Sequence, residues 1–148
     1  MEGARDVVDA LKERGILVVI ISAGVDLFVS AVASMLDVDD WAANGFSYDD
    51  EGFLMDEGVC RVPAWNKGEM VEKLIRINGF DPSQVFSVGD SIMDISMHVP
   101  GSRFIGFNPT REEAISAFNA ANVPVVPGPN LRDIWPILFD GEAFPEEQ

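Results

Sequence analysis

The sequence predicts an α/β fold with a mostly parallel sheet. Short, almost wholly apolar runs alternate with amphipathic helical segments along the 148 residues. Such runs are typical of strands in parallel sheets, and their alternation with helices is typical of a sheet covered by helices. The length suits one domain with a hydrophobic core. We expect residues 1–140 to form this domain and residues 141–148 to form a flexible C-terminal tail.

The first part of the chain predicts a helix, a strand and a second helix. Residues 4–14 have the apolar spacing of an amphipathic helix, and Gly15 is a natural stop for it. The run "ILVVIIS", residues 16–22, predicts a strand buried on both faces. Residues 25–36 predict a helix with Asp26 near the start of its first turn. These elements form a β-α unit with a short loop at the carboxyl end of the strand.

The middle of the chain predicts a β-hairpin, a helix and another buried strand. Residues 44–62 alternate between apolar and polar side chains and contain the turn sequence "DDEG", which indicates a hairpin or flap. Residues 67–77 have the spacing of an amphipathic helix. Residues 84–89, "QVFSVG", predict a second buried strand, and "DISMH" after it begins a short helix.

The last third predicts two further strands and two helices. Residues 110–121 indicate a helix with Thr110 as its cap and Glu113 three residues later, the pattern of a capping box. A proline lies inside the final helix, so we expect a kink near Trp135. The two strands and the final helix are predicted at 103–107, 123–126 and 130–139.

Composition and charge exclude several classes of function. The formal net charge of -15 argues against nucleic acid or an anionic membrane as the main partner, because phosphates would be repelled. The longest apolar runs are too short to cross a bilayer. With Cys60 as its only cysteine the chain can form no intrachain disulfide, which fits a reducing compartment. We therefore expect a cytoplasmic protein, and we interpret Cys60 as a small apolar filler in the hairpin.

Two loops at the carboxyl ends of predicted strands are candidates for a ligand site, because ligands of open α/β sheets bind there. In the second loop, residues 89–94, Asp90 follows a buried strand directly and is a good Mg²⁺ ligand. Asp94 comes four residues later and lies on the same side if the segment is helical. The two acids can share a metal, or one can bind it while the other orients a lysine or a water. Alternatively, both acids cap the following helix.

The first loop and one lysine could bind an anion. The Ser22 hydroxyl and the amides of Ala23 and Gly24 can point at an anion, helped by the N-terminus of the next helix. The alternative is a serine that only caps this helix. Lys67 is one of three lysines and begins its helix, where its charge opposes the helix dipole, so a role in neutralising a phosphate is suggested. The alternative is a solvated surface lysine.

Together these motifs resemble motifs II, III and IV of the haloacid dehalogenase superfamily. "VVIISAGVD", residues 18–26, and "GDSIMDISM", residues 89–97, are most similar to the phosphoserine phosphatase-like branch, with "KGE", residues 67–69, between them. The resemblance implies a three-layer Rossmann-like core with a hairpin flap. It also implies a Mg²⁺-dependent phosphatase that hydrolyses a small phosphomonoester through an aspartyl-phosphate.

The resemblance also implies a role for each matched residue. Ser22, with Ala23 and Gly24, would bind the phosphoryl oxygens, and Lys67 would stabilise charge on the phosphate. Asp90 would bind Mg²⁺, and Asp94 would orient Lys67 or join the metal shell. Met93 departs from the pattern, since related enzymes often carry a polar residue there.

One departure matters more. Motif I, written DxDx(T/V), carries the nucleophile and the general acid/base of the family, and this chain lacks it together with the helical cap that follows. Asp37, Asp39 and Asp40 follow a predicted helix, so we do not accept them as substitutes. We expect the chain to be nearly inactive alone. The alternatives are a non-catalytic phosphate- or partner-binding module and a truncated fold without a function of its own.

The departure also predicts a defect in the sheet. In the family the motif I strand is central, between the strands that here end at Ser22 and Gly89. Without it these two strands either pair directly or leave a gap with two exposed edges. We therefore expect a fragment, a split product completed by another chain, or a homo-oligomer that fills the gap.

Overall fold

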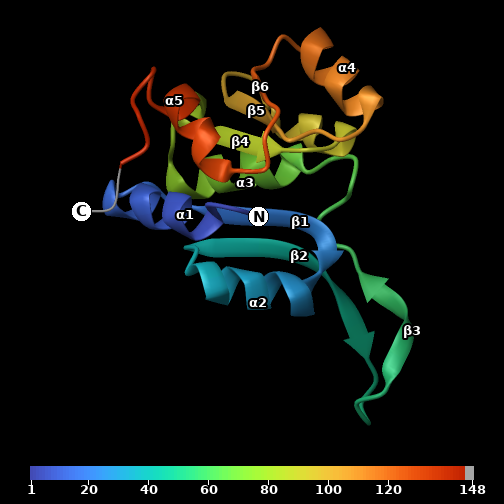
Figure 1. Cartoon of the computed structure of the whole chain (residues 1–148). Helices are drawn as coiled ribbons and strands as arrows, with labels where there is room; N and C mark the ends of the chain where they lie inside the picture. The colour runs from blue at the N-terminus through green and yellow to red at the C-terminus, as the bar shows by residue number, and fades with distance from the viewer. Residues whose placement is uncertain (146–148) are drawn as a thin grey trace.

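Two separate three-stranded sheets form the framework of the computed structural model, which describes residues 1–145 (Figure 1). Their strand orders are β1-β2-β3 and β4-β5-β6. The strands are β1 Val19–Val25, β2 Asp40–Tyr48, β3 Leu54–Val59, β4 Phe86–Gly89, β5 Arg103–Phe107 and β6 Val125–Val126. The helices are α1 Ala4–Glu13, α2 Asp26–Leu36, α3 Gly68–Asn78, α4 Glu112–Ala120 and α5 Trp135–Leu138. Three 3₁₀ helices complete the list: η1 Pro82–Gln84, η2 Ile92–Met97 and η3 Leu131–Ile134.

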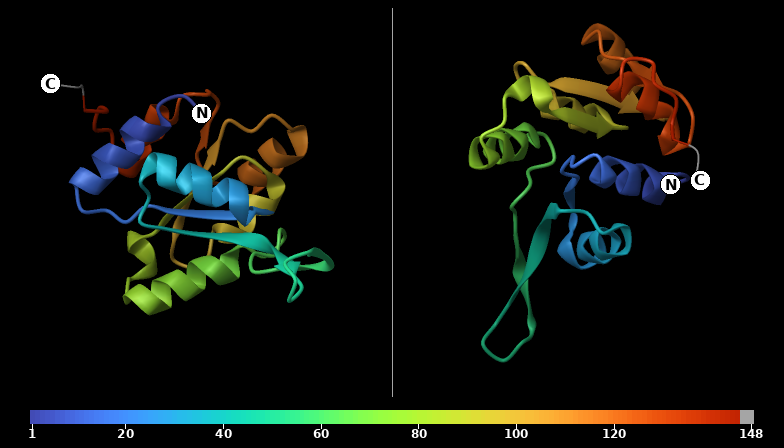
Figure 2. Two further views of the ribbon diagram at one scale, coloured as in Figure 1. Left: turned by 90° about the horizontal axis from the view of Figure 1, so that it is seen from below. Right: turned by 90° about the vertical axis from the view of Figure 1, so that its left-hand side faces the viewer.

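The first sheet combines a parallel pair with the predicted flap. β1 and β2 run parallel, with Val19 opposite Asp40, and β2 then extends beyond β1 to pair antiparallel with β3 (Figure 1). The hairpin formed by β2 and β3 projects away from the rest of the chain, as the right view of Figure 2 shows. β2 begins at Asp40, four residues before the predicted hairpin, because its acidic start hides the strand pattern. The Asp39 carboxylate accepts a hydrogen bond from the Val18 amide (2.8 Å) and so fixes the start of this pair.

The second sheet holds most of the core. β4, β5 and β6 are parallel, and β5 lies between the other two. Phe104 and Phe118 pack with their ring centroids 5.4 Å apart, and Gly106 leaves the space that the Phe118 ring occupies. One core cluster lies under α3, η2 and α4, and the other lies under α1 and the C-terminal helices. The buried members are Val71, Met97, Val99, Phe104, Ala114, Phe118 and Val123 in the first cluster, and Val7, Ile105, Phe107, Val126 and Ile134 in the second.

Helix α1 connects the two sheets. Its buried residue Val7 belongs to the cluster on β5 and β6, so the helix packs on the second sheet. Its other side contacts the first sheet's helix, since Lys12 Nζ lies 2.7 Å from Asp37 Oδ2 at the end of α2. Arg5 also donates to the Met35 carbonyl of that helix. The two sheets are therefore held in one arrangement although no strand pairs them in residues 1–145.

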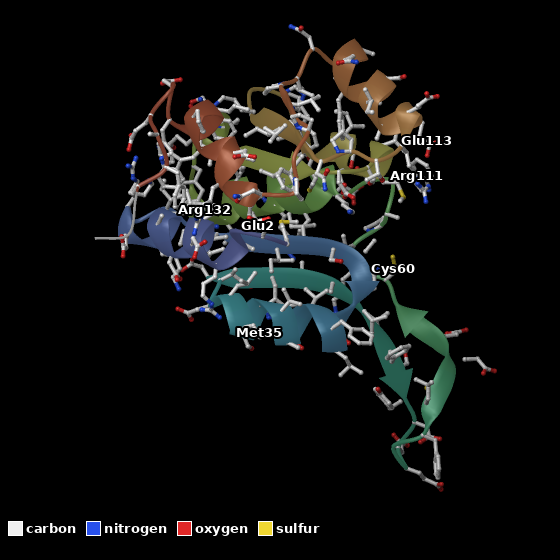
Figure 3. All side chains as sticks on the ribbon, viewed as in Figure 1. Glu2, Met35, Cys60, Arg111, Glu113 and Arg132 are labelled. Atoms are coloured by element: carbon white, nitrogen blue, oxygen red, sulfur yellow. The ribbon has the colours of Figure 1, made fainter. Side chains whose placement is uncertain are left out.

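Most predicted elements are present, and three details differ. The prediction of a first strand buried on both faces was wrong, because Val19 to Ala23 are only half-buried. The Thr110 capping box is also absent. Arg111 adopts an extended conformation and becomes the N-cap of α4, with no side-chain cap hydrogen bond. Cys60 is exposed rather than a buried filler, because it lies just after β3, at the base of the projecting hairpin (Figure 3).

The C-terminal region follows the prediction in part. The final helix changes from 3₁₀ to α at Trp135, where a kink was expected. In the predicted tail, Glu142 forms an ion pair with Arg14, and Phe144 packs beside Trp135 at 5.0 Å between ring centroids. Residues 146–148 lie outside the described residues, so the flexible tail stays a prediction. In the part of the chain that is described, no helix has both the length and the apolar character needed to cross a membrane.

Candidate functional site

A half-buried lysine and a buried carboxylate meet at the carboxyl end of β4. Lys67 Nζ lies 2.5 Å from Asp94 Oδ1, and the two side chains are only 13% and 7% exposed. Lys67 is the N-cap residue of α3 and Asp94 lies in η2, so the contact joins segments that are 27 positions apart. Lys67 is thus not the solvated surface lysine of the alternative interpretation. Because both charges lie away from water, each holds the other in place.

The second oxygen of Asp94 caps the short helix that contains it. Oδ2 accepts hydrogen bonds from the amides of Asp90 (3.1 Å) and Ser91 (3.0 Å) and from the Ser91 hydroxyl (2.9 Å). Ser91 and Asp94 form a capping box at the start of η2. One oxygen of Asp94 therefore caps the helix while the other contacts Lys67. The Asp90 side chain does not take part in the cap.

The surroundings of Asp94 keep it ionised. Burial raises the pKa of the Asp94 carboxyl, but the hydrogen bonds from Lys67 and Ser91 and the Lys67 charge outweigh burial, and the pKa lies below its ordinary value. A carboxyl whose pKa is lower in the folded than in the unfolded state stabilises the fold above its unfolded-state pKa. That contribution disappears as the pH falls through the folded-state pKa.

We expect Asp94 to make the folded state acid-sensitive. The free energy of unfolding, measured by urea denaturation, should be steady from about pH 5 to 7 and fall below about pH 4. In an Asp94→Asn variant the fall should be shallower, because this group no longer titrates. Asp50→Asn, in the exposed hairpin turn, is the matched control and should keep the wild-type profile. Identical profiles for both variants would contradict the depressed pKa of Asp94.

Strand β1 continues through the predicted first loop, Ser22 to Gly24, as far as Val25, with an irregularity after Ile21 just before α2 begins. The Ser22 hydroxyl accepts a hydrogen bond from the Gly24 amide (3.0 Å). Val25, not Ser22, is the N-cap residue of α2, so Ser22 is not a helix cap. A side chain on Gly24 would come within 3.1 Å of the Ser22 hydroxyl. The loop therefore places one hydroxyl and the free N–H groups of a helix start at the same end of the sheet, an arrangement suited to anions.

The end of β1 lies close to the elements that hold the lysine–carboxylate pair. Ile21 packs against the core cluster that contains Val71 of α3 and Met97 of η2. In residues 1–145 no hydrogen bond or ion pair joins Ser22, Ala23 or Gly24 to Lys67, Asp90 or Asp94. The structure thus brings Lys67, Asp90 and Asp94 together and places the first loop beside them without direct contact.

Other acids do not complete the site. Asp40 pairs with Val19 at the start of β1, so Asp37, Asp39 and Asp40 lie at the opposite end of this strand from Ser22. This placement agrees with their rejection as substitutes for the missing aspartates. Met93 is half-buried in η2 and adds no polar group to the site.

One carboxylate in the site remains available for a metal. Asp90 is exposed, and its side chain makes no hydrogen bond with any residue from 1 to 145, whereas both oxygens of Asp94 are engaged. No group of three metal-ligating side chains is present among the described residues. Mg²⁺ is usually bound by one or two carboxylates, with waters and substrate phosphate as the other ligands. The residues present therefore fit Mg²⁺ through Asp90 and do not form a closed cage.

Sequence reasoning missed Asn44, which connects the first loop to the flap. Its Nδ2 donates to the carbonyls of Ala23 and Val62 (both 3.0 Å). Its Oδ1 accepts from the amides of Arg61 and Val62 (both 2.8 Å). Asn44 lies on β2 opposite Val25, so one half-buried amide fixes both the loop and the returning end of the hairpin. An asparagine within an apolar strand pattern was the available signal.

We expect Asn44→Ala to loosen the first loop and the base of the flap together. The variant leaves two carbonyls and two amides without partners, so it should lose about 2 to 3 kcal/mol of unfolding free energy. Amide hydrogen exchange should accelerate at Gly24, Arg61 and Val62. Asn44→Asp separates the two halves of this amide, because it retains the acceptor for the Arg61 and Val62 amides but cannot donate to the Ala23 and Val62 carbonyls. Faster exchange at the flap but not at Gly24 in this aspartate variant would contradict the assignment.

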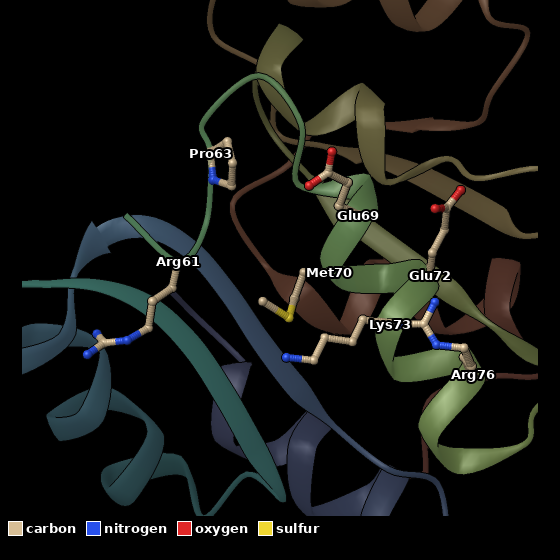
Figure 4. A pocket seen from close by; sticks show the side chains of 7 residues that line it. All are labelled: Arg61, Pro63, Glu69, Met70, Glu72, Lys73 and Arg76. Carbon is tan, nitrogen blue, oxygen red and sulfur yellow. The ribbon is translucent and has the colours of Figure 1, made fainter. Parts of the chain in front are cut away.

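A hollow in the surface lies apart from the candidate site residues Ser22, Lys67 and Asp90. It is formed between the base of the flap and α3 (Figure 4). Its lining residues are Arg61, Pro63, Glu69, Met70, Glu72, Lys73 and Arg76. Lys67, Asp90 and Ser22 do not line it, and its cationic and acidic side chains are mixed, so we assign no ligand to it.

Comparison with known proteins identifies the family. A family model described as haloacid dehalogenase-like hydrolase matches residues 1–98. A phosphoserine phosphatase of Methanocaldococcus jannaschii is 32% identical over 113 residues, which cover 72% of this chain and 50% of that protein. A phosphoserine phosphatase of Wolinella succinogenes is 31% identical over 97 residues, 66% of this chain and 47% of that protein. The chain thus spans about half the length of these curated relatives.

Solved structures agree with the sequence matches. A substrate-bound phosphoserine phosphatase complex superposes with a TM-score of 0.79 and 28% identity, over 93% of this chain and 63% of that one. A phospho-aspartyl intermediate analogue of phosphoserine phosphatase gives a TM-score of 0.78 and 29% identity, with the same coverage. These superpositions include both sheets and confirm the predicted Rossmann-like α/β core. The chain belongs to the haloacid dehalogenase-like hydrolase family, as a phosphoserine phosphatase-like member.

Proposed function

We propose that the site formed by Ser22, Lys67, Asp90 and Asp94 is the phosphate- and Mg²⁺-binding part of a phosphomonoesterase that acts on a small phosphorylated substrate. The observation that supports this most is the buried Lys67–Asp94 pair beside the exposed Asp90 at the end of β4. A lysine held by a buried carboxylate is a fixed cation, and fixed cations stabilise charge on a phosphoryl group. The names of the relatives support phosphoserine as the type of substrate for the whole enzyme.

Each residue would act on the phosphate in a different way. Lys67 would neutralise a non-bridging oxygen, and Asp94 would keep the ammonium aimed at that position. Ser22 and the amides of Ala23 and Gly24 would donate to the other oxygens once the anion replaces the internal Ser22–Gly24 contact. Asp90 would hold Mg²⁺, which when bound supplies electrostatic polarisation of the phosphoryl group. We assign Asp94 to the lysine rather than to the metal, because its oxygens are engaged.

The same residues do not provide a complete reaction. In the 148 residues no motif I aspartate precedes the Ser22 strand, so the site contains no candidate nucleophile for an aspartyl-phosphate. We therefore propose that this chain alone binds phosphate and Mg²⁺ but turns over little or no phosphate ester. A non-catalytic phosphate- or partner-binding module is the second candidate, and the missing nucleophile favours it.

Binding and turnover can be measured separately. We expect inorganic phosphate with Mg²⁺ to shift the amide NMR signals of Ser22, Ala23 and Gly24, and we expect Lys67→Met to abolish these shifts. Hydrolysis of p-nitrophenyl phosphate with Mg²⁺ should stay at background. Turnover that is lost in Asp90→Asn would show that a substitute nucleophile exists, and absent phosphate binding would contradict both candidates.

We propose a cytoplasmic location, which fits a chain with a single cysteine. We also propose no nucleic acid or membrane partner, because the net charge of -15 repels phosphate-rich surfaces.

A further inference from the structure

Helix α2 is apolar on all sides. From Leu27 to Leu36 it has no charged side chain, and two serines are its only polar residues. Its inner side packs on β1 and β2, with Val29 and Ala33 buried. A helix that is hydrophobic all round is normally covered all round, whereas a surface helix carries charged residues on its outer side. The composition of α2 therefore favours a second contact on the side away from β2.

The outer side of α2 is exposed. Leu27, Phe28 and Met35 are 62%, 75% and 67% exposed, and Val32 is 46% exposed. At about 100° per residue, these four side chains and Ala31 form one apolar stripe about 140° wide. Figure 1 shows α2 on the outer side of β2, with no element of residues 1–145 beyond it. The stripe thus has the composition of a buried surface and no cover.

The exposed apolar area is large enough for a specific contact. Trp41 of β2 extends the stripe, since it borders one hollow together with Ser34 of α2 and is 37% exposed. Side chains of this size present about 150 to 250 Å² each when uncovered, so on the order of 600 Å² of apolar surface is exposed. Two such surfaces would bury about 1,200 Å² together, which is where specific interfaces begin. We call this surface the α2 face; it consists of Leu27, Phe28, Ala31, Val32, Met35 and Trp41.

Charge favours an uncharged partner surface and does not oppose a second copy. The chain carries a net charge of -15, but the acids at both ends of α2 are paired with cations. Asp26 Oδ2 lies 3.3 Å from Arg61 Nη1, and Asp37 Oδ2 lies 2.7 Å from Lys12 Nζ. A basic partner would find no charge to pair with on the α2 face, whereas a second α2 face is equally apolar. The remaining repulsion between two copies acts over longer distances and is screened by salt.

We propose that the α2 faces of two copies of this chain pack against each other in a symmetric, antiparallel dimer. In a two-fold contact the same patch serves both copies, so it has to be complementary to itself. Antiparallel pairing about Ala31 and Val32 places Phe28 of each copy against the partner's Met35. Contacts between a methionine sulfur and an aromatic ring are favourable, and the small Ala31 lets the two helices approach at the axis.

This dimer is independent of the other interpretations of the chain. It does not use the edges of β1 and β4, so it differs from the gap-filling oligomer expected from the sequence. It also does not depend on the proposed function, because Lys67, Asp90 and Asp94 belong to neither α2 nor β2.

Sedimentation equilibrium of the whole chain at about 1 to 200 µM tests the dimer directly. We expect a dissociation constant in the micromolar range that falls about threefold or more between about 0.05 M and about 0.5 M sodium chloride, because salt screens the repulsion. Phe28→Glu should raise the dissociation constant by about 30-fold or more, since it places a charge within the apolar contact. Ile77→Glu on α3 is the matched control, because Ile77 is 66% exposed and lies outside the α2 face. It should leave the dimer unchanged.

A charge pair tests the antiparallel arrangement. In the double variant Phe28→Glu with Met35→Lys, each glutamate would face the partner's lysine, so dimerisation should recover to within about tenfold of the wild type at low salt. Added salt should weaken this variant, the reverse of its effect on the wild type. Within one helix the two positions lie about 10 Å apart, so they do not form a direct ion pair there. Both are exposed, so the variants should keep the wild-type circular dichroism and urea midpoint at about 1 µM.

The alternatives give different results. A wild-type chain that stays monomeric at about 200 µM at both salt concentrations would overturn the proposal. If that monomer also bound the apolar dye anilinonaphthalene sulfonate and Phe28→Glu did not, the occupant of the α2 face would be a different protein. A dimer that persists in Phe28→Glu would place the contact elsewhere on the chain. A double variant that fails to recover would overturn the antiparallel arrangement.

Discussion

Replacing Asp94 by alanine is expected to destabilise the chain by about 3 to 5 kcal/mol, the range found when one member of a buried ion pair is removed. The Lys67 ammonium, with its side chain only 13% exposed, would lose its counter-charge. The amides of Asp90 and Ser91 would lose the acceptor that now caps η2. Urea denaturation at neutral pH measures the loss, and inorganic phosphate titration should show that binding is lost as well.

Two comparisons separate the ion pair from the helix cap. Lys67→Met removes the charge and keeps the cap, so it should cost less than Asp94→Ala. In the double variant Lys67→Met with Asp94→Asn, both charges are gone and the two single losses should not add. Asp56→Ala on β3 is a control for the removal of an exposed acid. A loss below about 1 kcal/mol for Asp94→Ala, the size of a surface pair, would contradict burial of the pair in solution.

The sequence was sufficient to predict where the candidate site residues lie in the fold. Lys67 and Asp90 each lie at the end of a helix or strand, and Ser22 lies where the apolar run of β1 stops, so these positions can be recognised locally. The Lys67–Asp94 contact was expected from a resemblance and not from periodicity, because the two residues lie on different elements. Its burial depends on how α3 packs on η2, and no local pattern contains that information.

What the sequence could not predict depends on neighbours. "ILVVIIS" has the composition of a strand covered on both faces, yet β1 is half-buried and pairs with β2 alone among the described residues. The composition of a strand indicates how much burial its side chains favour, whereas the burial that they reach depends on which elements pack around them. Asn44 was missed for a related reason, since its four hydrogen bonds connect three separate backbone segments.

Gly68→Ala is the second change with a large expected effect, and it acts on the same pair through the backbone. A Cβ at Gly68 would lie 2.2 Å from the Ser96 carbonyl oxygen. This oxygen belongs to the backbone of η2, so it cannot turn away as a flexible side chain would. The first turn of α3 would have to move away from η2, at a cost of about 3 kcal/mol. Lys67, the preceding residue, would move with it and lose its contact with Asp94.

Gly68→Ala should therefore weaken both the packing of α3 on η2 and the position of Lys67 in the candidate site. We expect a lower free energy of unfolding in urea, and we expect the phosphate-induced NMR shifts at Ser22 to Gly24 to weaken because Lys67 is displaced. Gly128→Ala is the matched control, since its Cβ would meet only the movable Asp133 carboxylate at 3.1 Å. It should change stability by less than about 1 kcal/mol. If Gly68→Ala were as stable as this control, α3 and η2 would be further apart in solution than the Lys67–Asp94 contact requires.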